Sequence, residues 1–187
     1  MLRIRLSLNI NLVLNHEPLG LYGIEQRVLL RKGKGESLRH VLMKLMGYMM
    51  FYHESLVIEG SAHQHYKPDL VRLDEQGDPV QWVDCGYTAI RKLNRITQKN
   101  YKTMVDIIKP TPTELRLYKT QAERKLRYPE RVRHWSFAPD FIQKFSNLVT
   151  GRHELTVSIT SDMSSAYLLI DEQTLYTPII FMAGGLT

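Results

Sequence analysis

The sequence predicts one α+β domain, residues 1–187, in which helices pack against a mixed sheet. Three patterns predict this class. Apolar and polar residues alternate with period two over residues 2–14, a helical stripe follows from residue 38, and strand and helix patterns then succeed one another to residue 148. With 43% hydrophobic and 24% charged residues, the 187-residue chain has an ordinary globular balance and enough apolar surface for a single core.

The N-terminal part is predicted to be a two-stranded ribbon followed by a helix. Residues 2–14 form a long strand with one buried face, a turn-rich break spans residues 16–20, and residues 23–32 return as an antiparallel strand. A helix then runs from Leu38 to about Tyr52, because its apolar residues recur at the spacing of a core stripe.

The C-terminal part alternates helices and strands and then closes with short strands. Thr88 is expected to cap a helix over residues 89–98, and Pro112 and Pro139 mark the starts of two later helices. The predicted elements are a strand at 101–108, a helix at 113–126, a strand at 132–137, a helix at 139–148, and an antiparallel meander at 155–159, 166–170 and 177–181.

A β-hairpin in residues 66–84 carries the central prediction. Glycine within the polar run Glu75-Gln76-Gly77-Asp78 breaks an extended pattern, which is a hairpin signal. If residues 76 and 77 form the loop, residues whose numbers add to 153 face each other, so Asp69 opposes Asp84 on one face of the sheet. The same rule pairs Val71 with Trp82 and Leu73 with Val80.

Two facing carboxylates repel each other unless something compensates their charge. A cation would do so, and oxygen ligands at this separation suit Mg²⁺ or Mn²⁺, with Glu36 at the start of the first helix as an additional ligand. Without a metal, one carboxyl would keep its proton to a raised pKa. The alternative is that Asp69 and Asp84 merely solvate or cap the two ends of their strands.

Positive charge is concentrated in the middle of the chain. Residues 91–133 contain thirteen Lys or Arg against four acids, a charge of +9, so that the remainder of the +6 chain carries −3. Such a segment indicates a polyanionic partner, most simply nucleic acid, although solvated helix faces have the same composition. The predicted contact residues are Arg91, Arg95, Lys99, Arg124, Lys125 and Arg127.

Compartment and membrane signals are few. Cys85 is the single cysteine, so no internal disulfide is expected. A signal peptide needs an uninterrupted apolar run, and arginine and asparagine residues interrupt the apolar residues at the N-terminus. No apolar run reaches the length of a membrane span. A cytoplasmic location and no membrane partner are therefore expected, and the sequence leaves the oligomeric state open.

Several short motifs together resemble a known family. Pro68-Asp69, Asp84 at a strand end and Glu36 on the first helix are similar to the PD-(D/E)xK motif of restriction-endonuclease-like proteins. More narrowly, the chain resembles the YaeQ family over residues 36–58, 84–93 and 135–170. The resemblance implies a restriction-endonuclease-like core with an added N-terminal β-ribbon and C-terminal antiparallel meander.

The resemblance also implies chemistry, with one departure. Nucleases of this superfamily place a lysine two residues after the strand acid, and here that position is Gly86. Lys92, reaching back from the next helix, is the preferred replacement, and Lys67, opposite Gly86 in the predicted register, is the other. The two resulting hypotheses are a metal-dependent nuclease acting on nucleic-acid phosphodiesters and a non-catalytic nucleic-acid-binding or regulatory protein on the same fold.

Overall fold

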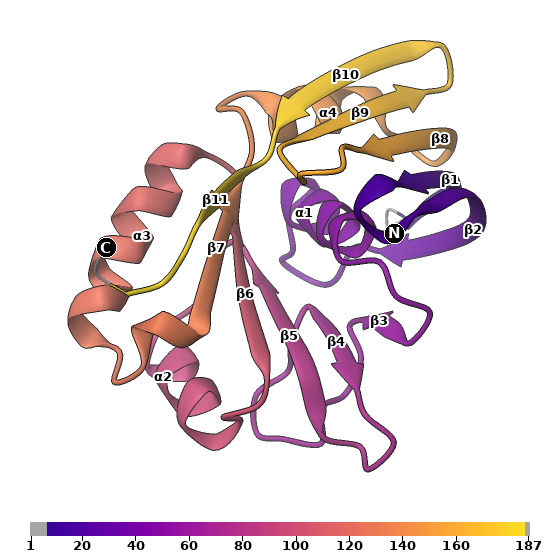
Figure 1. Ribbon diagram of the computed structural model, residues 1–187. Coiled ribbons are helices and arrows are strands. Elements are labelled where there is room, and N and C mark those ends of the chain that lie inside the picture. Colours follow the sequence, from indigo (N-terminus) through magenta and orange to yellow (C-terminus); the bar gives the residue numbers. More distant parts are fainter. Residues whose placement is uncertain (1–6, 186–187) are drawn as a thin grey trace.

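The protein is built from two mixed sheets and four α-helices, as seen in a computed structural model that describes residues 7–185 (Figure 1). The first sheet has the order β10 (Gln173–Pro178), β9 (Ser165–Ile170), β8 (Arg152–Ile159), β1 (Ser7–His16), β2 (Leu21–Arg31). The second has the order β11 (Ile180–Met182), β7 (Val132–Ser136), β6 (Met104–Lys109), β5 (Pro79–Cys85), β4 (Leu70–Leu73), β3 (Leu56–Ile58).

The first sheet joins the two ends of the chain. The alternation in β1 buries Leu8, Ile10, Leu12 and Leu14 on one face, and β1 pairs antiparallel with β2, as predicted for the ribbon. The expected meander is formed by β8, β9 and β10. Because β1 also pairs in parallel with β8, the ribbon and the meander are one sheet. Residues 2–6 of the predicted first strand lie outside the described residues.

The last predicted strand is divided between the two sheets. Residues 177–181 were expected as one strand of the meander, but β10 ends at Pro178 and β11 begins at Ile180. β11 pairs with β7 at the edge of the second sheet. Between them lies the buried Ile179, whose N–H donates to the carbonyl oxygen of Ser164. The chain passes from the first sheet to the second at this residue.

The hairpin of the second sheet has the predicted register over its middle. Leu70 pairs with Val83, Val71 with Trp82 and Arg72 with Gln81, all adding to 153. The pairing of Leu73 with Val80 is wrong, because a bulge makes Pro79 the partner of Leu73. The cause is Asp74, whose Oδ1 accepts the N–H groups of Gln76 and Asp78 and so closes a longer turn.

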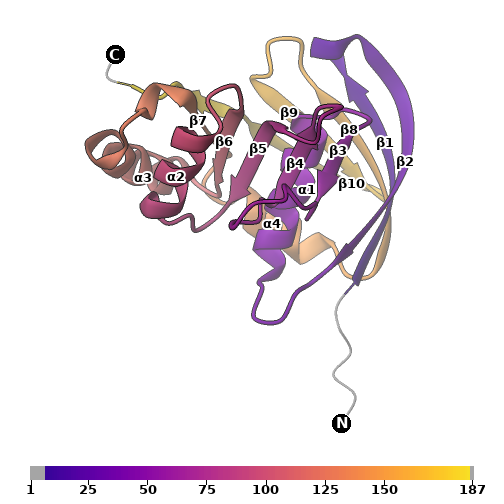
Figure 2. The same cartoon turned by 90° about the horizontal axis from the view of Figure 1, so that it is seen from below.

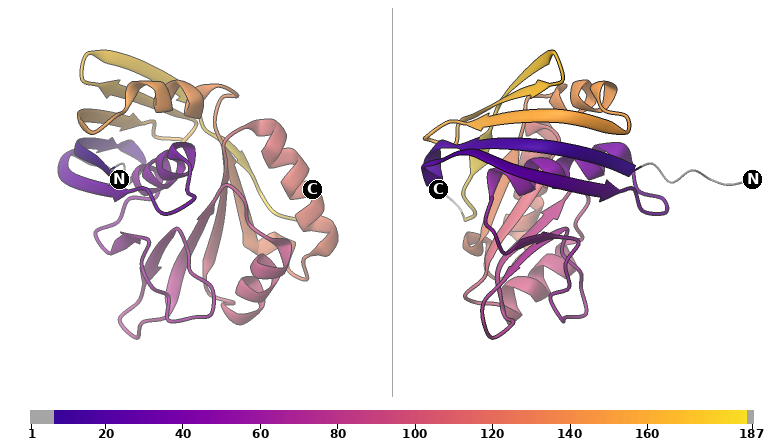
Figure 3. Two further views of the ribbon diagram at one scale, coloured as in Figure 1. Left: turned by 180° about the vertical axis from the view of Figure 1, so that it is seen from behind. Right: turned by 90° about the vertical axis from the view of Figure 1, so that its right-hand side faces the viewer.

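Helix α1 (Leu38–Met50) lies between the two sheets, so that both of its sides are covered (Figures 2 and 3). Ser37 caps it by accepting the N–H of His40. Helix α4 (Phe141–Leu148) packs beside α1 in the same core, and its N-cap is Asp140, so the predicted helical residue Pro139 precedes it. This packing accounts for the methionine-rich stripe of α1, since thioethers fill irregular space between sheets.

Helices α2 (Ile90–Lys99) and α3 (Pro112–Lys125) cover the opposite face of the second sheet (Figure 1). The predicted cap of α2 is wrong by one residue, because Ala89 is the N-cap and Thr88 is buried before it. Short 3-10 turns lie at Glu17–Leu19 and Pro129–Arg131. Among the described helices, none combines the length and apolarity needed to cross a bilayer.

We predict that Gly47→Ala lowers the free energy of unfolding. A Cβ at Gly47 would lie 2.8 Å from Ile108 Cδ1 and 3.3 Å from Leu70 Cδ1, so these buried side chains or α1 would have to shift. Overpacking of this kind costs about 1–3 kcal/mol, more than the better helix propensity of alanine returns. Urea denaturation measures the change. Gln121→Ala on the exposed side of α3 is the control, and an equal response of the two variants would contradict the prediction.

Candidate functional site

Asp69 and Asp84 meet where β4 begins and β5 ends, but they are not a regular facing pair. The ladder starts at Leu70 and Val83, and one residue earlier the N–H of Asp69 donates to Val83 O at 3.0 Å. Asp69 Oδ2 then accepts the N–H of Cys85 at 2.7 Å, in the position that a main-chain carbonyl would take. The two carboxylates therefore turn to partners on opposite faces of the sheet.

Asp69 pairs with His40 of α1. Its Oδ1 is 3.0 Å from His40 Nε2. This hydrogen bond raises the pKa of His40 against the opposing effect of burial. Burial alone would raise the pKa of Asp69, but the bonds from His40 and the Cys85 N–H outweigh it and lower that pKa below its ordinary value. Asp69 is therefore held in its charged form.

Asp84 pairs with Lys92 of α2. The Lys92 ammonium lies 2.7 Å from Asp84 Oδ2, and Trp82 Nε1 donates to Oδ1 at 3.1 Å. Burial raises the pKa of Asp84, Lys92 opposes this, and the charge of Asp69 adds to the rise. The two acids thus have pKa values displaced in opposite directions, which is the condition for unlike proton-transfer roles.

Lys44 pairs with two further acids beside Asp69 and Asp84. Its side chain is 2% exposed, and its ammonium lies 2.6 Å from Glu36 Oε1 and in contact with Glu59 Oε1. Burial would lower the pKa of Lys44, but the hydrogen bonds with Glu36 and Glu59 raise it above its ordinary value. Glu36, predicted as a metal ligand, also lies 3.5 Å from His40 and accepts the N–H of Gly33 at 2.7 Å.

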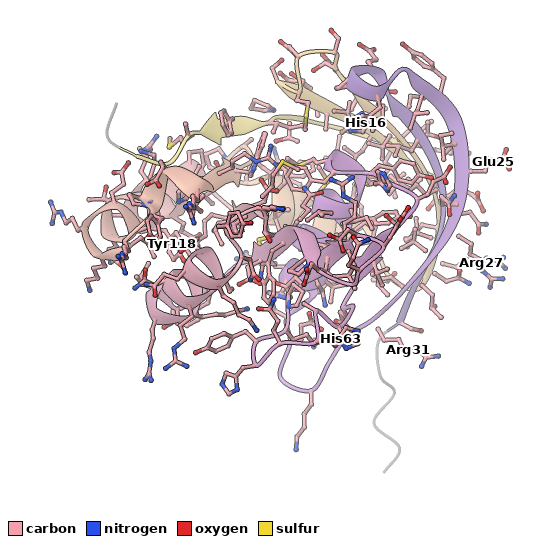
Figure 4. The ribbon with its side chains drawn as sticks, turned by 60° about the horizontal axis from the view of Figure 1, so that its bottom comes forward. His16, Glu25, Arg27, Arg31, His63 and Tyr118 are labelled. Carbon is pink, nitrogen blue, oxygen red and sulfur yellow. The ribbon has the colours of Figure 1, made fainter. Side chains whose placement is uncertain are left out.

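Lys109, at the end of the neighbouring strand β6, comes close to the position of the missing motif lysine. Its ammonium donates to the carbonyl of Gly86 and lies 3.7 Å from the ring centre of Tyr118, which projects from α3 (Figure 4). Burial lowers the pKa of Lys109 to about 8. The sequence analysis counted Lys109 only as part of the basic segment. The feature that could have identified Lys109 as a site residue is its position at the end of a buried strand, next to the strand that carries Asp84.

The two predicted replacement lysines lie differently. Lys92 reaches back from α2 and pairs with Asp84, and its role at a phosphate stays a prediction. Lys67 has an exposed side chain, and its main-chain carbonyl accepts a hydrogen bond from Lys92 Nζ at 3.1 Å. On the α1 side, an open cavity of about 570 Å³ is lined by residues that include Lys34, Glu36, Ser37, His40, Gly86 and Tyr87.

The predicted contact residues for nucleic acid are all exposed, and together they are called the basic face below. They are Arg91, Arg95 and Lys99 of α2 and Arg124, Lys125 and Arg127 at the end of α3. The N–H of Arg127 donates to Asn94 Oδ1, and Arg131 Nη1 donates to Thr97 O, each at 3.1 Å. These bonds hold the two helix ends together. The ring of Tyr128 lies 5.3 Å from the guanidinium of Arg127 and 4.3 Å from that of Arg131.

Residues 26–177 match the family model described as YaeQ protein. The chain belongs to the YaeQ family. Two solved YaeQ structures are similar over almost their whole length. The YaeQ protein from Xanthomonas axonopodis pv. citri has a TM-score of 0.79 at 18% identity, covering 97% of this chain and 99% of that one. The YaeQ protein from Pseudomonas syringae has a TM-score of 0.80 at 13% identity, covering 98% and 99%.

A comparison with curated proteins finds no match. At these identities the structural matches establish the YaeQ fold, which agrees with the mixed α+β class. The roles of the site residues stay a prediction.

The acids do not fit a divalent ion as they are arranged. Across residues 7–185, no three His, Cys, Asp or Glu side chains come together in a way that would hold a metal. Asp69 is hydrogen-bonded to His40 and to the Cys85 N–H instead, and Asp84 accepts from Trp82 and forms an ion pair with Lys92.

We predict that Asp69→Asn lowers the pKa of His40, because it removes the largest cause of the rise while burial remains. With the raised pKa, His40 contributes stability that is complete below its ordinary value of 6.5 and is lost as the pH rises through its folded value. Asp69, with its lowered pKa, contributes above its ordinary value of 3.8 and loses that contribution as the pH falls through its folded value.

An NMR titration of the His40 ring measures the change. Asp78→Asn, in the turn of the hairpin, is the control that should leave the His40 midpoint in place. A midpoint that does not move in Asp69→Asn would show that Asp69 does not hold the proton on His40.

Proposed function

We propose that this YaeQ-family protein binds nucleic acid through the basic face of α2 and the end of α3, without cleaving it. The concentration of exposed cations on two helix ends that are held together carries the proposal. Arg91, Arg95 and Lys99 recur every four residues, so they project from one side of α2. We also propose that the protein acts in the cytoplasm.

A phosphodiester backbone matches this face physically. Nucleic acid presents regularly spaced negative charges, and cations that neutralise them release counterions, which makes binding depend on salt. The guanidinium groups of Arg127 and Arg131 beside Tyr128, and the exposed ring of Tyr101, also provide flat surfaces on which unpaired bases stack. Single strands are therefore the preferred form in this proposal.

Two features favour binding over cleavage. Gly86 stands where the nuclease motif has its lysine. Each predicted metal ligand has a cationic side chain as partner: Asp69 has His40, Asp84 has Lys92 and Glu36 has Lys44. Electrostatic compensation is therefore already present within the chain.

The rival proposal is a metal-dependent nuclease on a restriction-endonuclease-like core. It assigns Mg²⁺ or Mn²⁺ to Asp69, Asp84 and Glu36, with Lys92 or Lys67 stabilising charge on the phosphate. The opposite pKa displacements of Asp69 and Asp84 favour it, since such pairs divide acid and base roles. It requires the cationic partners to move away from the acids.

We predict that replacing Arg91, Arg95 and Lys99 together by alanine weakens binding to single-stranded DNA or RNA. Each lost phosphate contact should reduce the slope of log affinity against log salt by about 1. Fluorescence anisotropy with labelled oligonucleotides over a range of salt concentrations measures both quantities.

The control removes the same charge elsewhere, by replacing Arg27, Arg31 and the exposed Arg152 of β8 with alanine. Arg27 and Arg31 lie on the outer side of β2, far from Tyr118 and α3 (Figure 4). Equal losses in the two triple variants would indicate a general charge effect and contradict the assigned face.

We further predict that the intact protein does not cut DNA or RNA in Mg²⁺ or Mn²⁺, because the acids are already paired with cations. A gel assay on labelled oligonucleotides tests this. Cleavage that disappears in Asp84→Ala would replace the binding proposal by the nuclease one, and cleavage that persists in Asp84→Ala would indicate a contaminating enzyme.

A further inference from the structure

The acids at the edge of the second sheet alternate with cations that the chain itself supplies. Glu59, Lys44, Glu36, His40 and Asp69 follow one another in contact on the α1 side. Asp84 continues the cluster on the α2 side, where its partner is Lys92. The four acids share three cations, because Lys44 pairs with both Glu36 and Glu59, and every acid is thus in contact with a cation that the chain supplies.

Lys92 differs from the other cations in what it contacts. Its ammonium bridges a carboxylate oxygen and a main-chain carbonyl oxygen, Asp84 Oδ2 at 2.7 Å and Lys67 O at 3.1 Å. A carboxylate combined with a backbone carbonyl is the donor set that hard divalent cations take in proteins. The contact with Asp84 is a close ion pair, and the ammonium donates its hydrogen bond to Lys67 O.

The surroundings keep Lys92 in this position. Asp84 is 1% exposed, and its negative charge would be costly to bury without a partner. The Lys92 ammonium lies 5.9 Å from the ring centre of Trp82, within reach of a favourable cation–π contact. Trp82 also donates to the second oxygen of Asp84, so one buried ring orients both members of the pair.

We propose that the Lys92 ammonium takes the place of a divalent cation at Asp84 and Lys67 O, so that this edge works without metal in the intact protein. Removing the ammonium then converts the same oxygens into a site for a hard divalent ion. This inference concerns the acidic edge and does not rest on nucleic-acid binding by the basic face.

The test is a Mn²⁺ titration of the wild type and of Lys92→Gln, followed through the indole N–H signals. The chain has two tryptophans, so the spectrum contains a reporter and an internal reference. Trp82 Nε1 bonds to Asp84, whereas Trp135 Nε1 bonds to Asp106 in the core. Paramagnetic Mn²⁺ at Asp84 would broaden the Trp82 signal first.

We expect selective broadening of Trp82 in Lys92→Gln at Mn²⁺ concentrations of roughly 1 mM or below, the weak end of oxygen-ligand sites. In the wild type, the same broadening should need about tenfold more Mn²⁺ or be absent. Adding Asp84→Asn to Lys92→Gln should abolish it. Lys144→Gln is the matched control, because Lys144 pairs with the exposed Asp140 at 2.6 Å and its removal frees a carboxylate at the surface.

Two results would overturn the inference. One is Asp84-dependent broadening in the wild type at the concentration that suffices for Lys92→Gln, which would mean that metal and lysine do not compete. The other is selective broadening in neither protein, which would mean that these oxygens are no cation site.

If Lys92→Gln does not fold alone, refolding with and without Mn²⁺ replaces the titration. Recovery of the native indole spectrum in Mn²⁺, prevented by Asp84→Asn, supports the inference, and failure to recover overturns it.

Discussion

The burial of α1 between two sheets is the constraint on which the rest of the structure depends. The two sheets bury most residues of α1, and Lys44 lies among them, 2% exposed (Figure 3). An unpaired ammonium there would be strongly destabilising. Glu36, which precedes the N-cap Ser37 and so lies outside the helix on which it was predicted, and Glu59 from the segment after β3 compensate it. The position of Glu36 is therefore explained by the packing of α1, whatever else it does.

The same packing bears on the missing motif lysine. Gly86 has φ +67°, a conformation that side chains other than glycine rarely adopt. A Cβ at this position would lie 3.3 Å from both His40 Nδ1 and Met43 Cε of α1. A lysine at residue 86 would have to overcome the backbone strain and displace the His40 and Met43 side chains. The close packing of α1 against β5 therefore favours glycine at residue 86. Lys109 of the adjacent strand places its ammonium at the Gly86 carbonyl.

The sequence predicted the local patterns well and the distant pairings poorly. The period-two run of β1, the core stripe of α1 and the hairpin register at Leu70 to Arg72 depend on neighbouring residues, and all were found. The parallel pairing of β1 with β8 joins residues 143 positions apart, such as Asn9 and Arg152. The residue pattern of a strand does not identify the strand with which it pairs. β3 was missed because three residues carry too little periodicity.

The site was predicted to a similar extent. Arithmetic on the hairpin brought Asp69 and Asp84 to one place, and the spacing along α2 brought Lys92 to Asp84. What the arithmetic could not give was the direction of each carboxylate. That direction depends on His40 of α1 and on two groups of β5, the N–H of Cys85 and the indole of Trp82. Lys109 was missed for the same reason, since β6 joins the site through sheet order.

These contacts give the two aspartates a structural role that is independent of catalysis. Asp69 accepts the N–H of Cys85 at the strand end, and Asp84 fixes the indole of Trp82 and the ammonium of Lys92 between α2 and the sheet. Removing either carboxylate would leave a buried donor without its partner, at a cost of about 1–3 kcal/mol. The presence of both acids is therefore as well explained by the assembly of the second sheet as by a metal. Only the behaviour of Asp84 when Lys92 is absent separates the two explanations.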